Sequence, residues 1–314
     1  MRCSKCDASA VTLIRYSGQH LCRDHFLAFV ERRVKHELRS QVDLSGGERI
    51  AVGLSAGKDS SVATVLLHDI LRARRDVELV AITVDEGIAS YRPGSLPLAE
   101  ALCKGLGIEH RIVRLEDTAG WAMDDVVGAD PTAIPCSYCG VFRRQALNVA
   151  AKETDADYLA TGLNLDDTAQ SILMNVARGD IDKLARLGPH ERVQPGLVPR
   201  LQPLRMIPEK EAYLYAMLRG IPFHDATCPH AERAQRGRFR EIVNHLEEES
   251  PGTRHAIVRG YDQLRPLFAE HFPPAPLQEC VVCGEPTSGI TCKACELAAK
   301  LATVDGIESR TQSR

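Results

Sequence analysis

The sequence predicts an α/β protein with a doubly wound parallel sheet, flanked by a small zinc module at each end of the chain. Two observations predict the sheet: short apolar runs alternate with helical patterns along the middle of the chain, and polar, glycine-containing turns follow two of those runs. The cysteines gather in close pairs near both termini, which predicts the modules. The 314 residues, 44% of them hydrophobic, suffice to bury a full core.

The first apolar run, residues 49–54, predicts the opening strand of the sheet. Further strands are expected at residues 78–84, 109–115 and 157–161. Apolar residues at helical spacing predict a connecting helix at 26–40 and helices after the strands at 59–74, 95–106, 143–153 and 166–178. Buried strands that alternate with helices form right-handed βαβ units and a parallel sheet covered on both faces. Ligands of such sheets bind where the strand order reverses.

Beyond residue 208 the pattern becomes mostly helical, with helices expected at 209–219, 231–249 and 251–267. The proline-rich residues 272–276 predict a stiff linker before the last cysteine pairs. We therefore divide the chain into five parts. They are an N-terminal zinc finger (1–28), a catalytic domain (29–207), its helical continuation (208–276), a C-terminal zinc finger (277–300) and a flexible tail (301–314).

The formal net charge is −3, so the composition has no global basic bias, and any contact with RNA depends on local patches. The densest patch contains Arg233, Arg236, Arg238 and Arg240, for which a solvated helix face is the alternative explanation. No apolar run approaches the roughly 18 residues that span a bilayer. The first residues also lack the apolar core of a signal peptide, so we expect a cytoplasmic protein.

The 11 cysteines are the strongest compositional signal, and only Cys103 stands apart from other plausible ligands. In a reducing cytoplasm, clustered thiols are more often metal ligands or catalytic groups than disulfides. Two sets each supply four ligands in two close pairs, as closed tetrahedral zinc sites require. The first set is Cys3, Cys6, Cys22 and His25, and the second is Cys280, Cys283, Cys292 and Cys295. We predict structural zinc in each set, with an ordinary surface histidine as the alternative for His25.

Residues 53–60, GLSAGKDS, form a polar turn between the first strand and its helix. Small residues let backbone N–H groups approach an anion, and the helix N-terminus adds partial positive charge. Lys58 can neutralise a phosphate, while Ser55 and Ser60 can donate hydrogen bonds to it. Asp59 suits Mg²⁺ rather than phosphate. The spacing differs from that of a Walker A loop. The alternative is an ordinary Ser/Gly turn that caps a helix.

Residues 161–168, TGLNLDDT, form a second strand-to-helix junction at the same edge of the sheet. Gly162 permits close approach to a nucleotide. Asp166 and Asp167 could hold Mg²⁺ or orient a base. The alternative is that Asn164 and Asp166 only cap the following helix.

A further C-x-x-C pair, Cys136 and Cys139, is joined by a distant third thiol, Cys228, which precedes a proline. Three thiolates leave one iron of a cubane cluster without a protein ligand, and sulfide or a sulfur donor can bind there. Two alternatives remain. The pair could be a redox couple or a persulfide relay without iron, or Cys228 could be a buried structural thiol.

The turn at 53–60 resembles the SGGKDS signature of the PP-loop ATP pyrophosphatases, which split ATP between the α- and β-phosphates. Ala56 replaces a glycine of that signature, and a requirement for positive φ there would strain an alanine, which we expect the loop to tolerate. The segment 162–167 resembles the G-x-N-x-D-D element of the tRNA-thiolating branch of this family. Zinc modules at both ends and residues 200–211, RLQPLRMIPEKE, make nearly the whole chain similar to the 2-thiouridine synthetases.

This resemblance implies a HUP-like fold and a tRNA-uridine 2-sulfurtransferase that adenylates the C2 carbonyl of a tRNA uridine and replaces its oxygen with sulfur. It implies ATP, Mg²⁺, a 4Fe–4S cluster and two Zn²⁺. The implied catalytic residues are Asp59, Arg143, Asp167, Cys136, Cys139 and Cys228, the three cysteines being the cluster ligands. The implied nucleotide-binding residues are Leu54, Ser55, Ala56, Gly57, Lys58, Asp59, Ser60, Val84, Gly162 and Asp167. Arg143 and its neighbour Arg144 follow Cys139 on a predicted helix and could face a substrate phosphate, with a solvated helix face as the alternative.

The implied partners are tRNA, a sulfur donor (a ubiquitin-like protein thiocarboxylate or sulfide) and a second copy in a homodimer. Two other functions remain: a non-thiolating PP-loop enzyme of the amide or lysidine type, and a zinc-dependent RNA-binding scaffold. The sequence leaves open which uridine is modified, which donor is used, and whether the cluster or a cysteine persulfide carries the sulfur.

Overall fold

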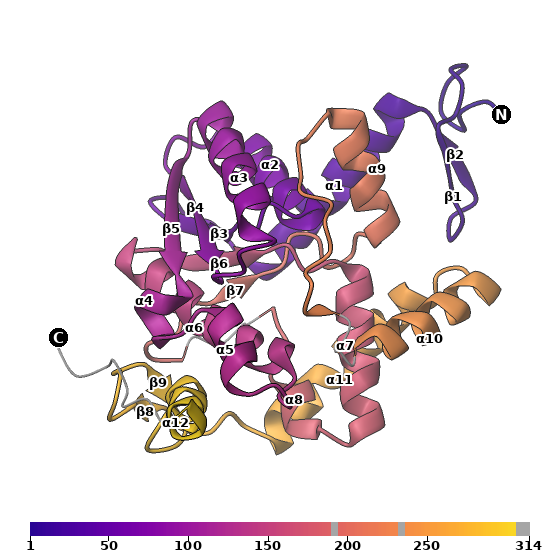
Figure 1. Ribbon diagram of the computed structural model, residues 1–314. Coiled ribbons are helices and arrows are strands. Elements are labelled where there is room, and N and C mark those ends of the chain that lie inside the picture. The colour runs from indigo at the N-terminus through magenta and orange to yellow at the C-terminus, as the bar shows by residue number, and fades with distance from the viewer. Residues whose placement is uncertain (190–193, 232–235, 306–314) are drawn as a thin grey trace.

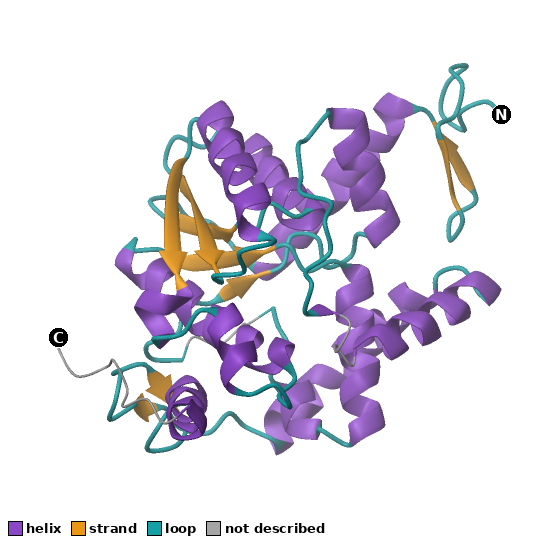
Figure 2. Ribbon diagram, in the orientation of Figure 1, coloured by secondary structure: helices purple, strands orange, loops and turns teal. Residues whose placement is uncertain are grey.

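A five-stranded, entirely parallel sheet lies at the centre of the computed structural model, which describes residues 1–189, 194–231 and 236–305 (Figures 1 and 2). Its strands, in spatial order, are β5 (Glu109–Arg114), β4 (Glu78–Asp85), β3 (Arg49–Gly53), β6 (Tyr158–Thr161) and β7 (Arg200–Leu201). Every neighbouring pair is parallel. The predicted α/β class and four of the five strands are thus confirmed, and β7, with two residues, is too short to show a pattern in the sequence.

The strand order reverses at β3. From β3 the chain builds outward to β4 and β5, and it then returns to place β6 and β7 on the other side of β3. The carboxyl ends of β3 and β6 therefore diverge into two loops, residues 54–57 and 162–164, at the edge where doubly wound sheets bind ligands.

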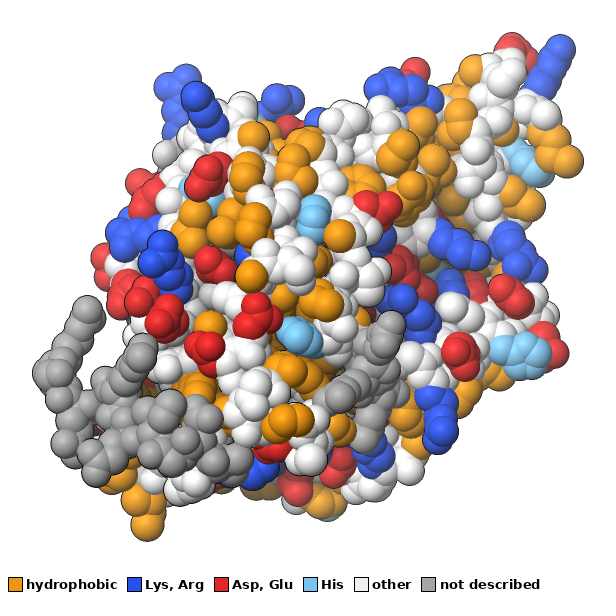
Figure 3. All heavy atoms as spheres, viewed as in Figure 1, with side chains coloured by type: hydrophobic (Ala, Val, Ile, Leu, Met, Phe, Trp, Pro, Cys, Tyr) orange, Lys and Arg blue, Asp and Glu red, His pale blue; other side chains and the backbone are white. Residues whose placement is uncertain are grey.

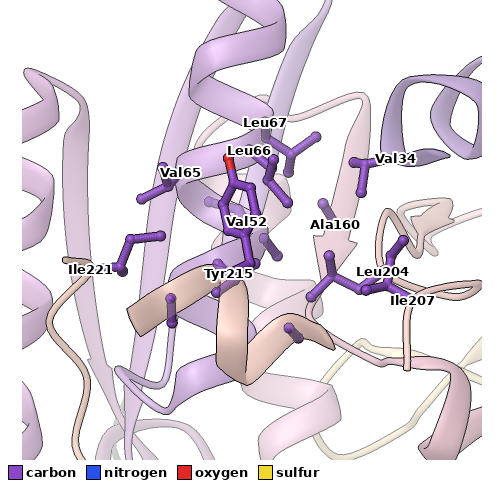
Figure 4. Close-up of a cluster of buried hydrophobic side chains, with 14 of the residues drawn as sticks. Val34, Val52, Val65, Leu66, Leu67, Ala160, Leu204, Ile207, Tyr215 and Ile221 are labelled. Carbon is purple, nitrogen blue, oxygen red and sulfur yellow. The ribbon is translucent and has the colours of Figure 1, made fainter. Parts of the chain in front are cut away.

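Side chains of β3 alternate between the two faces of the sheet, as a strand requires. Ile50 and Val52 enter one buried cluster, and Ala51, between them, enters another. The first face is covered by α1 (Arg23–Gln41), α2 (Lys58–Leu71), α3 (Arg92–Leu106) and α9 (Glu209–Arg219). Figure 4 shows this core, with Tyr215 pointing from α9 toward Leu66 of α2, both fully buried.

The second face is covered chiefly by α4 (Leu115–Ala119) and α6 (Pro135–Glu153), with α5 (Met123–Ala129) and α12 (Lys293–Asp305) packed on α6. The sequence predicted a helix over 143–153, whereas α6 begins at Pro135, because a proline fits the first helical position, where its missing N–H is not needed. The pair Cys136 and Cys139 therefore lies in the first turn of a long helix rather than in a loop.

The remaining helices form a separate layer beside the sheet: α7 (Leu165–Arg178), α8 (Ile181–Ala185), α10 (Arg236–Glu249) and α11 (Thr253–His271). Their shared core includes Ile172, Val243 and Tyr261. The helix predicted at 231–249 is described from Arg236 onward, and residues 232–235 of that prediction lie outside the described part.

Each terminal module contains one short antiparallel hairpin, β1 (Thr12–Ile14) with β2 (Gln19–Leu21), and β8 (Gln278–Glu279) with β9 (Pro286–Thr287). The two modules lie at opposite ends of the molecule (Figure 1). Helix α12 continues past the boundary that we predicted at residue 300, and Leu301 is fully buried. Among the described residues, every helix is too short or too polar to cross a bilayer.

Candidate functional site

The loop after β3 is closed by its own serines. The Ser55 amide donates to Ser60 Oγ (3.1 Å), Ser60 Oγ donates to the Gly57 carbonyl (2.9 Å), and the two hydroxyls lie 3.0 Å apart. The turn therefore presents its backbone at the N-terminus of α2, where the partial charge of the helix is positive. This arrangement suits an anion such as a phosphate.

Ala56 has φ of 59°, in the left-handed region that favours glycine. We expected a positive φ at this position because the PP-loop signature has glycine there. The structure has that positive φ, and the chain accommodates alanine in it. The Ala56 carbonyl accepts a hydrogen bond from the His224 amide (2.8 Å), which ties the loop to the segment that follows α9.

Lys58 is held between two carboxylates at the start of α2. Its Nζ donates to Asp59 Oδ2 (2.8 Å) and to Glu209 Oε1 (3.0 Å) of α9. The other oxygen of Asp59, Oδ1, is buried without a hydrogen-bond partner among the described residues. Burial raises the pKa of Asp59, and the Lys58 ammonium opposes that rise. An orphaned, buried carboxylate oxygen beside an anion-binding loop fits a divalent cation such as Mg²⁺.

Gly162, at the end of β6, allows this strand to touch the start of α2. A Cβ at Gly162 would lie 2.8 Å from both Cα and N of Ser60. We interpreted Gly162 as a position of close approach to a nucleotide, and the structure adds close approach to the backbone of the phosphate loop itself.

The helix after β6 begins with a capping box. Asn164 Oδ1 accepts from the Asp167 amide (2.9 Å), and Asp167 Oδ2 accepts from the Asn164 amide (3.4 Å). Asp166 is buried elsewhere: Oδ2 accepts from the Glu209 amide (2.8 Å), and Oδ1 faces Arg254 Nε at 3.0 Å. The alternative interpretation expected Asn164 and Asp166 to cap this helix. Asn164 does cap it, but the acid that takes part in the capping box is Asp167. Of the two acids, the half-buried Asp167 lies at the loop surface.

Cys136, Cys139 and Cys228 lie in one neighbourhood of the second sheet face. Cys136 Sγ is 3.8 Å from the His230 carbonyl oxygen, and Cys139 and Cys228 pack against the same apolar cluster. Burial, followed by the Cys228 thiol, raises the pKa of Cys136, and burial raises that of Cys139 to about 11. The three sulfur atoms are not as close together as the ligands of a single ion. A cubane cluster binds each thiolate on a different iron, so it does not require the close spacing of ligands to a single ion.

Sequence reasoning missed a chain of charges that links the phosphate loop to these cysteines. Arg92 donates to the Ser55 carbonyl (3.3 Å) and pairs with Glu86, and Glu86 Oε1 lies 3.6 Å from Arg143 Nη1. Glu86 is only 2% exposed, and each of its two carboxylate oxygens faces one of these guanidinium groups. Glu86 follows the end of β4, and its position at the carboxyl edge of the sheet was the signal that could have identified it.

Two of the residues that we predicted to bind the nucleotide, Val84 and Leu54, have side chains buried in the core. Val84 is 3% exposed and belongs to the apolar cluster of Tyr138 and Phe142. Leu54 is 1% exposed, and its amide donates to the Ile82 carbonyl (2.8 Å). Any contact between these two residues and a ligand would therefore involve their backbones.

The N-terminal quartet is arranged around one point. His25 Nδ1 lies 3.5 Å from Cys3 Sγ, 3.4 Å from Cys6 Sγ and 3.2 Å from Cys22 Sγ, and the sulfurs of Cys6 and Cys22 are 3.8 Å apart. Tetrahedral zinc with bonds of about 2.3 Å to sulfur and about 2.0 Å to nitrogen separates its ligands by about 3.5 to 3.8 Å. The four residues thus fit one zinc ion.

The C-terminal quartet has the same geometry. All four sulfurs lie within 4.8 Å of one another, and Cys283 and Cys292 are 3.6 Å apart. Gln145 of α6 donates to both of these sulfurs, at 3.4 and 3.9 Å. Such outer hydrogen bonds hold metal ligands in place, and this one ties the module to the helix that carries Cys136 and Cys139.

The arginine patch that we assigned to RNA is partly described. Arg238 and Arg240 are exposed on α10, and Arg240 Nη2 lies 3.8 Å from Glu209 Oε1, beside the phosphate loop. Arg233 lies outside the described residues. On the face drawn in Figure 3, basic and acidic side chains are interspersed rather than gathered in one basic field.

Comparisons with known proteins agree with this site. A model of the PP-loop domain matches residues 27–246, and a model described as the N-terminal LIM domain of the 2-thiouridine synthetase TtuA matches residues 2–27. The tRNA 2-thiolation protein NcsA of Haloferax volcanii is 42% identical over 97% of this chain and 100% of its own length. A tRNA-5-methyluridine(54) 2-sulfurtransferase of Pyrococcus horikoshii is 32% identical over 94% of this chain and 93% of its own.

A solved structure shares the whole architecture. The U34-tRNA thiolase NcsA of Methanococcus maripaludis, solved with its 4Fe–4S cluster, is 36% identical and has a TM-score of 0.83, with 96% of each chain covered. The fold, the phosphate loop and both terminal modules agree with these matches. The chain therefore belongs to the PP-loop family, in the group that contains the tRNA 2-thiolation proteins NcsA and TtuA.

Proposed function

We propose that this chain is an ATP-dependent tRNA-uridine 2-sulfurtransferase. The observation that carries the proposal is the common location of Cys136, Cys139 and Cys228, linked through Glu86 to the phosphate loop. Relatives that match nearly the full chain and are named for tRNA thiolation support the same reaction.

The reaction begins with ATP at the loop. Backbone N–H groups at the start of α2 and the Lys58 ammonium bind its phosphates, and Asp59 with Asp167 holds Mg²⁺. The C2 carbonyl oxygen of the uridine attacks the α-phosphate, a P–O bond forms, and pyrophosphate leaves. Adenylation matters because a carbonyl oxygen is a poor leaving group at neutral pH, whereas AMP is a good one. The C2–O bond then breaks when sulfur attacks C2, and AMP departs with the original oxygen.

Arg143 lies beside Cys139 and is linked through Glu86 and Arg92 to the phosphate loop, where ATP is proposed to bind. Its guanidinium group is about half exposed and faces Glu86, which fixes its position next to Cys139. From there it can stabilise negative charge that develops on the α-phosphate. Arg143 is thus proposed as an electrostatic catalyst, and Glu86 as the residue that positions it.

The three cysteines are proposed as ligands of a 4Fe–4S cluster. When bound, the cluster supplies one iron without a protein ligand, at which a sulfur atom can be held. Burial raises the pKa of Cys136 and of Cys139, so cluster binding must release the protons of these two thiols at neutral pH. The two terminal quartets are proposed as structural zinc sites, and tRNA, a thiocarboxylate or sulfide donor and a homodimer remain the predicted partners.

The test compares Cys139→Ala with Cys103→Ala, because Cys103 is a buried core thiol of α3 far along the chain from any proposed ligand. Each variant is reconstituted with iron and sulfide and assayed with unmodified tRNA for thiolated product, for AMP release and for absorbance at about 400 nm. Cys139→Ala should lose the absorbance and at least about a hundredfold of thiolation while still binding ATP. Cys103→Ala should retain all three.

Three other outcomes would overturn the proposal. Thiolation by Cys139→Ala at the wild-type rate would exclude these cysteines from sulfur transfer. AMP release that does not depend on sulfur, with a non-sulfur product on the tRNA, would indicate the amide or lysidine chemistry of other PP-loop enzymes. A chain that binds tRNA but never splits ATP would be a scaffold.

A further inference from the structure

A cavity of about 760 Å³ is lined by residues of α6, β7, α8 and α11. Four arginines line it: Arg144, Arg186, Arg200 and Arg265. Among the lining residues that the structure describes, Glu270 is the one carboxylate. The proposed reaction gives this cavity no role, although its volume is in the usual range for a ligand site.

Two of these arginines have no counter-charge. Within residues 1–189, 194–231 and 236–305, no hydrogen bond or ion pair is found for the side chain of Arg144 or of Arg200. Arg265 differs, because it donates to the Pro189 carbonyl (3.2 Å), and Arg186 lies 4.0 Å from Asp182. Uncompensated charges at a cavity wall are costly unless an anion joins them.

Neighbouring arginines make the positive charges of Arg144 and Arg200 still less favourable. Burial and then the Arg144 guanidinium lower the pKa of Arg200, and burial and then Arg143 lower that of Arg144. The positive groups thus repel one another in the ligand-free protein, and a bound anion would relieve that repulsion.

Most of the other described lining residues are apolar, and Asn148, Gln194 and Glu270 are the polar ones among them. Leu197, Val198 and Pro199 line one part of the cavity, and Pro266 and Pro273 line another. Guanidinium groups bind phosphate through paired N–H donors, and flat apolar surfaces accept a sugar or a base. The combination therefore fits a nucleotide better than it fits a free inorganic anion.

The cavity lies close to the proposed cluster cysteines, because Arg144 in its wall belongs to the same helix as Cys136 and Cys139. Arg144 follows Arg143 on α6. Its guanidinium group reaches back to Gly140, the residue after Cys139: a Cβ added at Gly140 would lie 3.5 Å from Arg144 Nη1. The cavity therefore begins on the neighbouring face of the same helix, within one or two turns of the proposed reaction centre.

We propose that the Arg144–Arg200 cavity binds a nucleotide of the RNA substrate other than the one that is modified, through its phosphate and its base. This inference rests on the proposed function, because it assumes that an RNA base reaches the cysteines. RNA is favoured over a protein carboxylate because Arg186 and Arg265 extend the basic wall to a second phosphate, which a single chain terminus does not possess.

The test is tRNA binding by Arg144→Gln/Arg200→Gln at several salt concentrations. Arg75→Gln is the matched control, because Arg75 is an exposed arginine in the loop between α2 and β4. Removal of each guanidinium that binds a phosphate should weaken binding of unmodified tRNA by about tenfold and reduce the slope of log affinity against log salt by about 1. The double variant should thus bind about a hundredfold more weakly, with a slope smaller by about 2. Its ATP affinity should be unchanged, and its melting temperature should be no lower than that of the wild type. Arg75→Gln should match the wild type.

The outcomes separate this inference from the proposed function. If the wild-type protein neither binds nor thiolates tRNA, the proposed function fails. If the wild type thiolates tRNA and the double variant binds it with wild-type affinity and salt dependence, the cavity is not an RNA site. If the double variant binds tRNA normally but loses only the activity driven by a protein thiocarboxylate, while activity with sulfide persists, the cavity receives a protein carboxylate and the inference is wrong.

Discussion

Lys300 of α12 donates a hydrogen bond to the hydroxyl of Tyr138, one of the two residues between Cys136 and Cys139 at the start of α6. The same ammonium group also reaches Asp130 Oδ2 (3.1 Å). Together with the bonds from Gln145 to Cys283 and Cys292, two of the proposed zinc ligands, this contact holds the C-terminal module against the helix that carries the proposed cluster cysteines. The N-terminal module has no such contact with α6 among the described residues.

We predict that the C-terminal zinc ion stabilises the cluster site and that the N-terminal zinc ion does not. Cys283→Ser should lose zinc and most of the absorbance at about 400 nm after reconstitution. Lys300→Ala should keep zinc but lose the cluster faster in air. The matched controls are Cys6→Ser, in the other module, and Lys293→Ala, on the exposed side of α12. Equal cluster loss in Cys6→Ser and Cys283→Ser would contradict the prediction.

Gly162→Ala should displace the phosphate loop, because the new Cβ would meet backbone atoms of Ser60 at 2.8 Å, where no side chain can yield. We expect ATP affinity to fall by at least about tenfold and stability to fall by about 1 to 3 kcal/mol. Calorimetric titration and thermal unfolding measure the two effects. Gly105→Ala is the control, since a Cβ there meets nothing and alanine stabilises an exposed helix position by up to about 1 kcal/mol.

Glu209→Gln should strengthen the binding of ATP or pyrophosphate. Lys58 is now shared by two carboxylates, Asp59 and Glu209, and a phosphate must compete with both for its N–H groups. Removal of one negative charge from this site should lower the dissociation constant by roughly fivefold. Glu241→Gln, an exposed acid on α10, controls for the change in net charge. Weaker binding by Glu209→Gln would mean that Glu209 positions Lys58 rather than competing for it.

His255 should make stability depend on pH between about 4 and 6.5. Burial, and then the charge of Arg33, lower its folded-state pKa to about 4, and its Nε2 lies 2.9 Å from Arg33 Nη2. The unfolded chain therefore binds more protons in this window, so the free energy of unfolding falls as the pH drops through it, by at most about 3 kcal/mol. His255→Gln should flatten this part of the profile. Urea unfolding at constant zinc content would measure it, and an unchanged slope would exclude His255 as the cause.

The sequence predicted the parallel sheet well because buried strands and amphipathic helices carry strong local patterns. Strands β3, β4 and β6 were each identified from a run of three or more apolar residues, whereas β5 offers only the adjacent pair Ile112 and Val113. The sequence did not predict β7, because a strand of two residues shows no periodic pattern. It also did not predict that α6 begins at Pro135, because a proline can either end or begin a helix.

The ligand quartets were determined by the sequence itself, since C-x-x-C spacing presents two sulfurs to one ion whatever surrounds them. The same holds for the phosphate loop, whose turn residues are local. Tertiary structure alone decided which charges face these groups. Lys58 meets Glu209 from 151 residues away, and Arg33 meets Glu211 from 178 residues away. Such pairs depend on how helices pack on the sheet, and no local spacing records that packing. The pair Arg144 and Arg200, which has no ion-pair partner in the described part of the chain, arises in the same way, because only the folded chain brings both guanidinium groups to one cavity.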